Sequence, residues 1–171
     1  VADQVGEAVV GRTGLRALSQ TMRDFGSTAR SVDWVRDTDS QRQLLTDRVE
    51  AMVAELAGAL KDARKLGPVE AGDLFNRHQD ALIRAAKAHG ELLQWEAFTD
   101  GVEAIDDPGT KQVLTWLRDL FGLGLIEADA GWFLANGRLS GARARAITEY
   151  IDTRLLPRIR RHAVDLVDAF E

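Results

Sequence analysis

The sequence of 171 residues contains no cysteine. This absence excludes disulfide bonds, thiolate catalysis and cysteine-based zinc sites. Histidine is scarce, with only His78, His89 and His162 present, and none of them follows a glutamate by three residues. The Glu-x-x-His pairs that build di-iron sites in helical bundles are therefore missing. The sequence predicts no metal site.

Long apolar runs and excess positive charge are also lacking. Charged residues interrupt every apolar stretch well before the ~20 residues that a membrane-spanning helix needs. The formal net charge of −5 argues against a nucleic-acid partner. No glycine-rich phosphate loop follows a strand pattern, and the first residues lack the basic start of a signal peptide. We expect an intracellular, soluble protein that binds no nucleic acid and has no membrane span.

Strand patterns are nearly absent, whereas helical periodicity runs through most of the chain. Apolar residues make up 45% of the sequence and charged residues 29%, which is typical of a globular domain. We predict an all-α fold, an up-and-down helical bundle of four to five long helices. The four clearest segments are residues 40–65, residues 70–105, residues 110–135 and the stretch from Ser140 to the last residues.

The apolar positions predict which faces these helices bury. In residues 110–135 apolar side chains point nearly all round, which is typical of a central helix. Ser140 is an expected N-cap, and Pro157 should kink the last helix. Residues 26–39 read as a loop with a turn of helix at Trp34. The face predicted for residues 70–105 consists of Phe75, His78, Leu82, Ala86, His89, Leu93 and Ala97.

An aromatic surface and a basic cluster are the candidate binding features. Four tryptophans are more than one small core easily absorbs, so part of this surface is a candidate interface, although core packing is the competing explanation. The basic cluster near the C-terminus is a candidate contact for an anion such as a nucleotide phosphate, with pairing to local acids as the alternative. The candidate interface residues are Trp95, Phe98, Trp132 and Phe133; the candidate anion contacts are Arg154, Arg158 and Arg161, beside Arg160.

Catalytic residues are harder to find. Glu127 and Asp129 follow a strongly apolar stretch, where a carboxyl group could gain a raised pKa and act as a base. They point about 200° apart on a helix, so they cannot serve one site together. A polar stripe on a buried helix is the simpler explanation.

Three ordered motifs carry a resemblance to a known family. Residues 123–141 read LGLIEADAGWFLANGRLSG, and residues 156–170 include the run Leu-Val-Asp-Ala-Phe. Residues 75–83, FNRHQDALI, precede them in the matching order. Together they resemble the C-terminal helical domain of acyl-CoA oxidases. The first residues, Val-Ala-Asp-Gln-Val, are similar to the linker helix that leads into this domain.

The resemblance implies a role within an FAD-dependent enzyme of fatty-acid β-oxidation. Acyl-CoA oxidases desaturate an acyl-CoA to the trans-2-enoyl-CoA and pass the electrons to oxygen, which gives peroxide. The family's catalytic glutamate lies in a Glu-Gly-(Asp/Glu)-Asn segment that this chain lacks, as it lacks the flavin-binding β domain. We therefore transfer no catalytic or cofactor-binding residue to this sequence. The chain alone should be inert and bind no FAD.

The same resemblance implies the domain organisation and the partners. Residues 1–40 would be linker helices and residues 41–171 the C-terminal helical bundle. The chain would pack against the catalytic domains of the same polypeptide, contribute to a homodimer, and belong to an enzyme whose substrate is acyl-CoA. We expect a bacterial source and a cytoplasmic location, or a peroxisomal location if the source is eukaryotic.

Two other functions stay open at this stage. The chain could be a free-standing helical module that descends from the oxidases and binds a partner protein. It could also be a ligand-binding bundle that uses the arginines of residues 154–161 for the phosphates of CoA.

Overall fold

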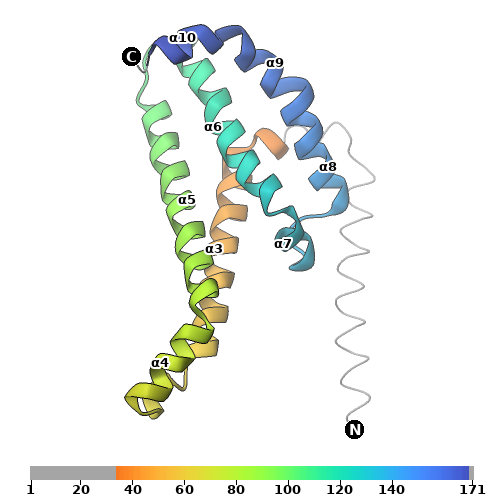
Figure 1. Cartoon of the computed structure of the whole chain (residues 1–171). Helices are drawn as coiled ribbons and strands as arrows, with labels where there is room; N and C mark the ends of the chain where they lie inside the picture. The colour runs from red at the N-terminus through yellow and green to blue at the C-terminus, as the bar shows by residue number, and fades with distance from the viewer. Residues whose placement is uncertain (1–33, 170–171) are drawn as a thin grey trace. The chain divides into compact units, whose positions relative to one another are not determined.

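The computed structural model describes residues 34–169, and every regular element within this range is a helix (Figure 1). The predicted all-α fold class is confirmed. A single helical turn covers residues 34–36, as expected around Trp34. The helices that follow are α3 (Thr38–Leu60), α4 (Pro68–Arg77), α5 (Gln79–Glu103), α6 (Pro108–Ala128), α7 (Ala130–Ala135), α8 (Gly141–Tyr150), α9 (Leu156–Ile159) and α10 (Ala163–Asp168).

These residues belong to two compact units. One unit consists of residues 39–118; the other contains residues 119–169 together with residues 34–38. The predicted linker, residues 1–40, lies almost entirely outside the described residues.

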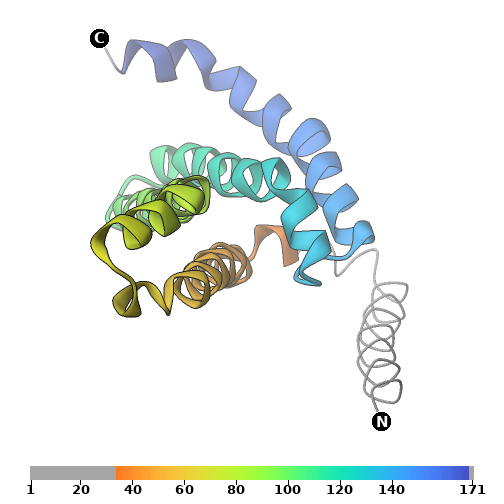
Figure 2. The same cartoon turned by 60° about the horizontal axis from the view of Figure 1, so that its bottom comes forward.

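The unit of residues 39–118 is built on the hairpin of α3 and α5, two long helices that lie side by side in both views (Figures 1 and 2). α3 ends at Leu60, earlier than predicted, and Arg64 and Lys65 lie in a separate short 3-10 turn, Ala63–Lys65. Apolar burial holds the two helices together. The buried apolar residues of the hairpin are Leu44, Leu45, Val49, Ala85, Ala88, Leu92, Trp95 and Val102.

The single helix predicted over residues 70–105 is wrong, because the chain breaks at His78. This residue leaves helical geometry, with φ −106° and ψ 11°, and separates α4 from α5. Asn76 and His78 have low helix propensity, and Asp80 in the first turn favours a new helix start through its interaction with the helix dipole. Two helices form where apolar periodicity alone predicted one.

The predicted buried face of this segment is also wrong by about one residue. Phe75, Leu82 and Leu93 are among the exposed apolar side chains, and His89 is exposed as well. The helix instead buries residues 85, 88, 92, 95, 99 and 102, whose alternating spacing of three and four keeps one narrow stripe toward α3. Small alanines in this stripe allow close approach, and Trp95 supplies a large buried area.

α6 begins with an N-cap that the sequence marks only as a turn. The Asp107 carboxylate accepts a hydrogen bond of 2.7 Å from the backbone N–H of Thr110, and Pro108 takes the first helical position. The hydrogen bonds from the Thr110 backbone and side chain hold the pKa of Asp107 below its usual value of 3.8. From Val113 to Glu127 every side chain is at least partly buried, as expected for a central helix.

The Asp107 cap should make stability depend on pH. Because the folded pKa is lowered, the stabilisation is present above pH 3.8 and is lost as the pH falls through the folded pKa. We expect Asp107→Asn, whose amide oxygen can still accept the bond, to keep the cap and remove this dependence. Asp107→Ala should lower stability at neutral pH as well. Unfolding curves between pH 2 and 7 test this, and an unchanged acid limb in Asp107→Asn would contradict it.

In the other unit, the turn after α7 forms as predicted. Gly137 has a positive φ of 63°, and the Arg138 N–H donates to the Phe133 carbonyl at 2.9 Å, which is a Schellman ending. The Ser140 hydroxyl caps α8 by accepting a bond of 3.2 Å from the Arg143 N–H. The helix predicted over residues 110–135 is interrupted at Asp129, so α6 and α7 are separate.

The last helix is disturbed around Pro157, as predicted. A π-helical turn, Ile151–Leu155, precedes α9, and a 3-10 turn, Arg160–His162, separates α9 from α10. Proline lacks the N–H that would bond the carbonyl four residues earlier. A wider π-helical turn and a tighter 3-10 turn therefore replace the regular α-helical hydrogen bonds in this segment. We call residues 156–168 the C-terminal arm. None of its side chains is fully buried.

Candidate functional site

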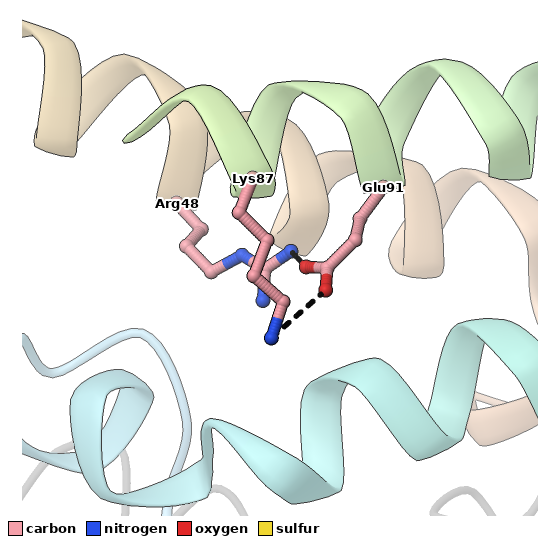
Figure 3. A network of polar contacts seen from close by, with 3 residues as sticks. All are labelled: Arg48, Lys87 and Glu91. Carbon is pink, nitrogen blue, oxygen red and sulfur yellow. Dashed lines mark hydrogen bonds and ion pairs between the residues drawn. The ribbon is translucent and has the colours of Figure 1, made fainter. Parts of the chain in front are cut away.

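A buried ion pair links α3 and α5 inside the hairpin. The Arg48 guanidinium donates to a Glu91 carboxylate oxygen at 2.7 Å, and Lys87 lies 3.6 Å from the other oxygen of the same carboxylate (Figure 3). The Arg48 side chain is only 1% exposed and that of Glu91 16%. A buried charge needs such a partner because losing its hydration is costly. The pair therefore fixes the register of the two helices.

Further polar contacts extend this seam between α3 and α5. The Trp95 indole N–H donates to the Gln41 side-chain oxygen at 3.3 Å, and both side chains are buried. Arg42 lies above the Trp95 ring, 5.8 Å from its centroid, and 4.0 Å from Glu96 at the surface. These side chains satisfy and orient one another, which is a structural role.

A second polar cluster in the unit of residues 119–169 surrounds Tyr150. Its ring is buried, and among the described residues Arg158 lies nearest to hydrogen-bonding its hydroxyl, although the geometry falls short of a full hydrogen bond. Burial raises the pKa of Tyr150, the charge of Asp119 adds to this, and the guanidinium groups of Arg36 and Arg158 oppose it. The phenol is therefore neutral at physiological pH and cannot serve as a base.

Removing the Tyr150 hydroxyl should cost little. The hydroxyl is buried and makes at most an imperfect hydrogen bond with Arg158, so Tyr150→Phe should change the free energy of unfolding by less than about 1 kcal/mol in either direction. The raised pKa also means that stability falls as the pH rises past the usual tyrosine value of 10.0, and the phenylalanine variant should lose that part of the alkaline dependence. Denaturant unfolding at pH 7 and 10.5 tests both. A loss above about 1 kcal/mol would instead show that the hydroxyl is satisfied.

The four aromatic residues predicted to form an interface differ in how deeply the structure buries them. Trp95 and Phe133 are fully buried, one in each unit, so the chain itself already covers them. Trp132 and Phe98 are half-buried, and the rings of Trp132 and Phe133 meet edge to face at 5.2 Å. An interface role at these positions stays a prediction, and only Phe98 and Trp132 have surface left for it.

The arginines predicted to contact an anion differ in their exposure and surroundings. Arg158 is half-buried near Tyr150, whereas Arg154 is exposed. Arg160 and Arg161 line an open groove with Asp152, Leu156, Pro157 and Ile159. Anion binding at Arg154, Arg158 and Arg161 stays a prediction.

The two carboxylates considered as bases are tied to structure. Glu127 accepts a hydrogen bond from the Thr148 hydroxyl of α8, and both line an open groove with Leu139 and Arg145. Asp129 lies at the start of α7. Across residues 34–169, no three His, Asp or Glu side chains come together in a way that could hold a metal ion. No helix in the same range is long and apolar enough to cross a membrane.

Sequence reasoning missed the Arg48–Glu91 pair and the Tyr150 cluster. A signal for the first was present, because Arg48 lies between apolar positions on the buried stripe of α3, four residues after Leu44 and three after Leu45. A charged residue within such a stripe predicts a buried partner. The sequence gave no comparable signal for Tyr150, because a tyrosine on the apolar face of a helix is usually an ordinary core residue.

The fold and these contacts define a class: an all-helical domain whose buried polar groups serve packing. Comparison with known proteins gives the family. Residues 37–171 match the family described as acyl-CoA oxidase. The chain belongs to the acyl-CoA oxidase family.

Individual proteins similar to this chain are also described as acyl-coenzyme A oxidases. The chain is 40% identical over 105 residues to peroxisomal acyl-coenzyme A oxidase 2 of Mus musculus, and 30% identical over 143 residues to acyl-coenzyme A oxidase 2, peroxisomal, of Arabidopsis thaliana. It is 33% identical over 104 residues to the probable acyl-coenzyme A oxidase acox-1.5 of Caenorhabditis elegans. The matches cover 60%, 81% and 60% of this chain but only 15%, 20% and 16% of those relatives. All three are eukaryotic, so the expected bacterial source is not supported.

Proposed function

We propose that this chain is the C-terminal structural domain of an FAD-dependent acyl-CoA oxidase. The whole enzyme would desaturate an acyl-CoA to the trans-2-enoyl-CoA, with oxygen reduced to peroxide. The single observation that carries this is the family match over residues 37–171. The start of the match at residue 37 agrees with the proposed division into a linker, residues 1–40, and a bundle, residues 41–171.

Two grooves lined by residues of the unit of residues 119–169 do not fit a flavin. These two grooves are open and mostly apolar, and each is lined by side chains of neighbouring helical turns. An isoalloxazine ring needs an enclosing site, and the pyrophosphate of FAD favours a glycine-rich turn at a helix start. We therefore place FAD and the reaction in the remainder of the parent enzyme and assign no chemical step to residues 34–169.

The proposed role of the C-terminal arm is to pack against the catalytic part of the same polypeptide. Leu156, Val164 and Val167 are exposed apolar side chains on a stretch in which no side chain is fully buried. Exposed apolar surface of this kind is typical of a surface that another domain covers. The parent would be a homodimer, as the resemblance implies.

The proposed location is the peroxisome. The relatives from mouse, rabbit and Arabidopsis are described as peroxisomal. Fluorescence microscopy of the full-length protein with a peroxisomal marker tests this. A diffuse cytoplasmic signal would contradict it.

The experiment that tests the function begins with the coding sequence around this chain. A reading frame that encodes a Glu-Gly-Asp-Asn-like segment upstream would allow expression of the parent and of a parent lacking residues 37–171. We expect acyl-CoA-dependent peroxide release from the parent, loss of activity and flavin content in the shortened protein, and no activity from the chain alone. A start codon directly before Val1 would overturn the proposal in favour of a free-standing interaction module.

A further inference from the structure

α5 carries a second apolar face, and this face is exposed. Leu82, Ile83 and Leu93 are 46%, 56% and 51% exposed, and Ala86 and Ala97 are exposed as well. At about 100° per residue, these side chains lie on one side of the helix, roughly 150° around from the stripe that packs toward α3. We call these five residues the outer face of α5.

The spacing of the outer face is typical of a surface that becomes buried. Leu82, Ala86, Leu93 and Ala97 recur at intervals of four and seven residues, which is why the sequence alone predicted burial here. Single exposed apolar residues are ordinary in a folded protein, whereas a regular stripe of them marks a contact surface. A helix that is apolar on two sides is typical of the interior of a larger structure.

The charged residues of this stretch are engaged on the other side of the helix. Glu91 binds Arg48 of α3, Lys87 lies beside the same carboxylate (Figure 3), and Glu96 lies 4.0 Å from another arginine of α3. The outer face itself contains no charged residue between residues 82 and 97. Covering it therefore forces no ion to lose its hydration, which is the main cost of burying a polar surface.

Small side chains on the outer face allow another helix to come close. Gly90 lies on the same side of α5 as Ala86 and Ala97, and no atom lies within 4 Å of the place where its Cβ would be. The distance between two packed helices depends on the side chains at their contact, so small residues shorten it. Leu93, one turn after Gly90, then supplies a large side chain for the contact.

The size of the outer face distinguishes between candidate occupants. Residues 82–97 rise about 24 Å along the helix axis, and a helix face is about 10 Å wide, so the two sides of such a contact would bury roughly 500 Å². Stable complexes of separate molecules bury about 1,200–2,000 Å². The face is therefore too small to hold a free protein or a second copy. A covalently linked domain needs far less area, because its effective concentration is of the order of millimolar.

The relatives contain enough polypeptide for such a linked domain. The 105 residues aligned with the mouse relative make up only 15% of it, and the Arabidopsis match covers 20%. We propose that the outer face of α5 is a docking surface for an apolar helix from the part of the parent enzyme outside this chain, within the same polypeptide. The contact rests on the proposed function for its occupant, and it lies in a different unit from the C-terminal arm.

Photo-cross-linking of the full-length parent identifies the occupant. Benzoylphenylalanine replaces Leu93 in one protein and, as the matched control, Val53 in another, because Val53 is 49% exposed on α3. After irradiation, we expect position 93 to be joined to a peptide from outside residues 1–171, in a product with the mass of one polypeptide. Position 53 should give at least about fivefold less of such a product. A product of twice the mass, coupling within residues 1–171, or no coupling at position 93 would overturn the proposal.

Polar substitutions give a second measurement. Leu82→Gln with Leu93→Gln keeps helix propensity, so the unfolding temperature of the 171-residue chain should stay within about 1 °C. In the parent the same pair should lower the unfolding temperature by at least about 2 °C, because two glutamines would be buried in an apolar contact. Val53→Gln should change neither protein. Equal shifts in the chain and in the parent would contradict a contact with the rest of the enzyme.

The outcomes for the docking surface and for the proposed function are separable. An active parent in which position 93 stays uncoupled would leave the oxidase function standing and refute the docking surface. A parent without oxidase activity whose position 93 still couples within one polypeptide would refute the function and leave the docking surface standing.

Discussion

Replacing Glu91 by alanine should lower the free energy of unfolding by about 3–5 kcal/mol. The reason is the environment of its partner, because the Arg48 side chain is 1% exposed and its 2.7 Å contact to Glu91 neutralises its charge. Without the carboxylate, a guanidinium stays buried between α3 and α5. Urea unfolding followed by circular dichroism measures the loss, provided that the slope m is unchanged.

A second ion pair between the same two helices is the matched control. Arg42 and Glu96 are 4.0 Å apart, and their side chains are 47% and 37% exposed. Water and salt screen this pair, so Glu96→Ala should cost only about 0–1 kcal/mol. Lys87→Ala should likewise cost little, because Lys87 is 75% exposed. Equal losses for Glu91→Ala and Glu96→Ala would show that burial does not decide the effect.

A double replacement separates the charge from the packing. Arg48→Met together with Glu91→Leu removes both charges and keeps most of the volume. We expect this variant to recover most of the stability lost in Glu91→Ala, because a buried ion pair replaced by apolar groups is often neutral. A double variant as unstable as Glu91→Ala would mean that the pair contributes more than mutual neutralisation.

The sequence was sufficient for the fold class and for the helix ends that carry strong local signals. Ser140, Asn136-Gly137 and Pro157 act through their own backbone and side-chain chemistry, and the structure confirms each. The buried face of α5 could not be predicted in this way. Leu82 and Leu93 are more apolar than Ala85 and Ala88, yet the alanines are buried because close approach of α3 favours small side chains there.

The burial of the aromatic residues predicted as an interface could not be predicted from local signals either. Trp95 and Phe133 looked like surplus aromatics for an interface, but each fills the core of a different unit. Dividing the chain into two units leaves room for more buried aromatic residues than one core would accept.

Truncating Phe133 to alanine should destabilise the unit of residues 119–169 by about 3–5 kcal/mol. The side chain is fully buried, among the core residues of that unit that include Leu123, Ile126 and Ile147. Its removal loses the transfer free energy of the ring and leaves a cavity. The Schellman bonds to its carbonyl come from the backbone and survive the substitution, so the effect should report packing alone.

The neighbouring aromatic residue is the natural control. Trp132 is larger than Phe133 but half-buried, so Trp132→Ala should cost less, about 1–2 kcal/mol, mostly through its lost edge-to-face contact with Phe133. Phe133→Leu, which keeps most of the volume, should also cost less than about 1.5 kcal/mol. Circular dichroism is the appropriate readout, because the tryptophan variant loses a fluorophore. A larger loss for Trp132→Ala than for Phe133→Ala would mean that the outer ring, and not the inner one, anchors α7.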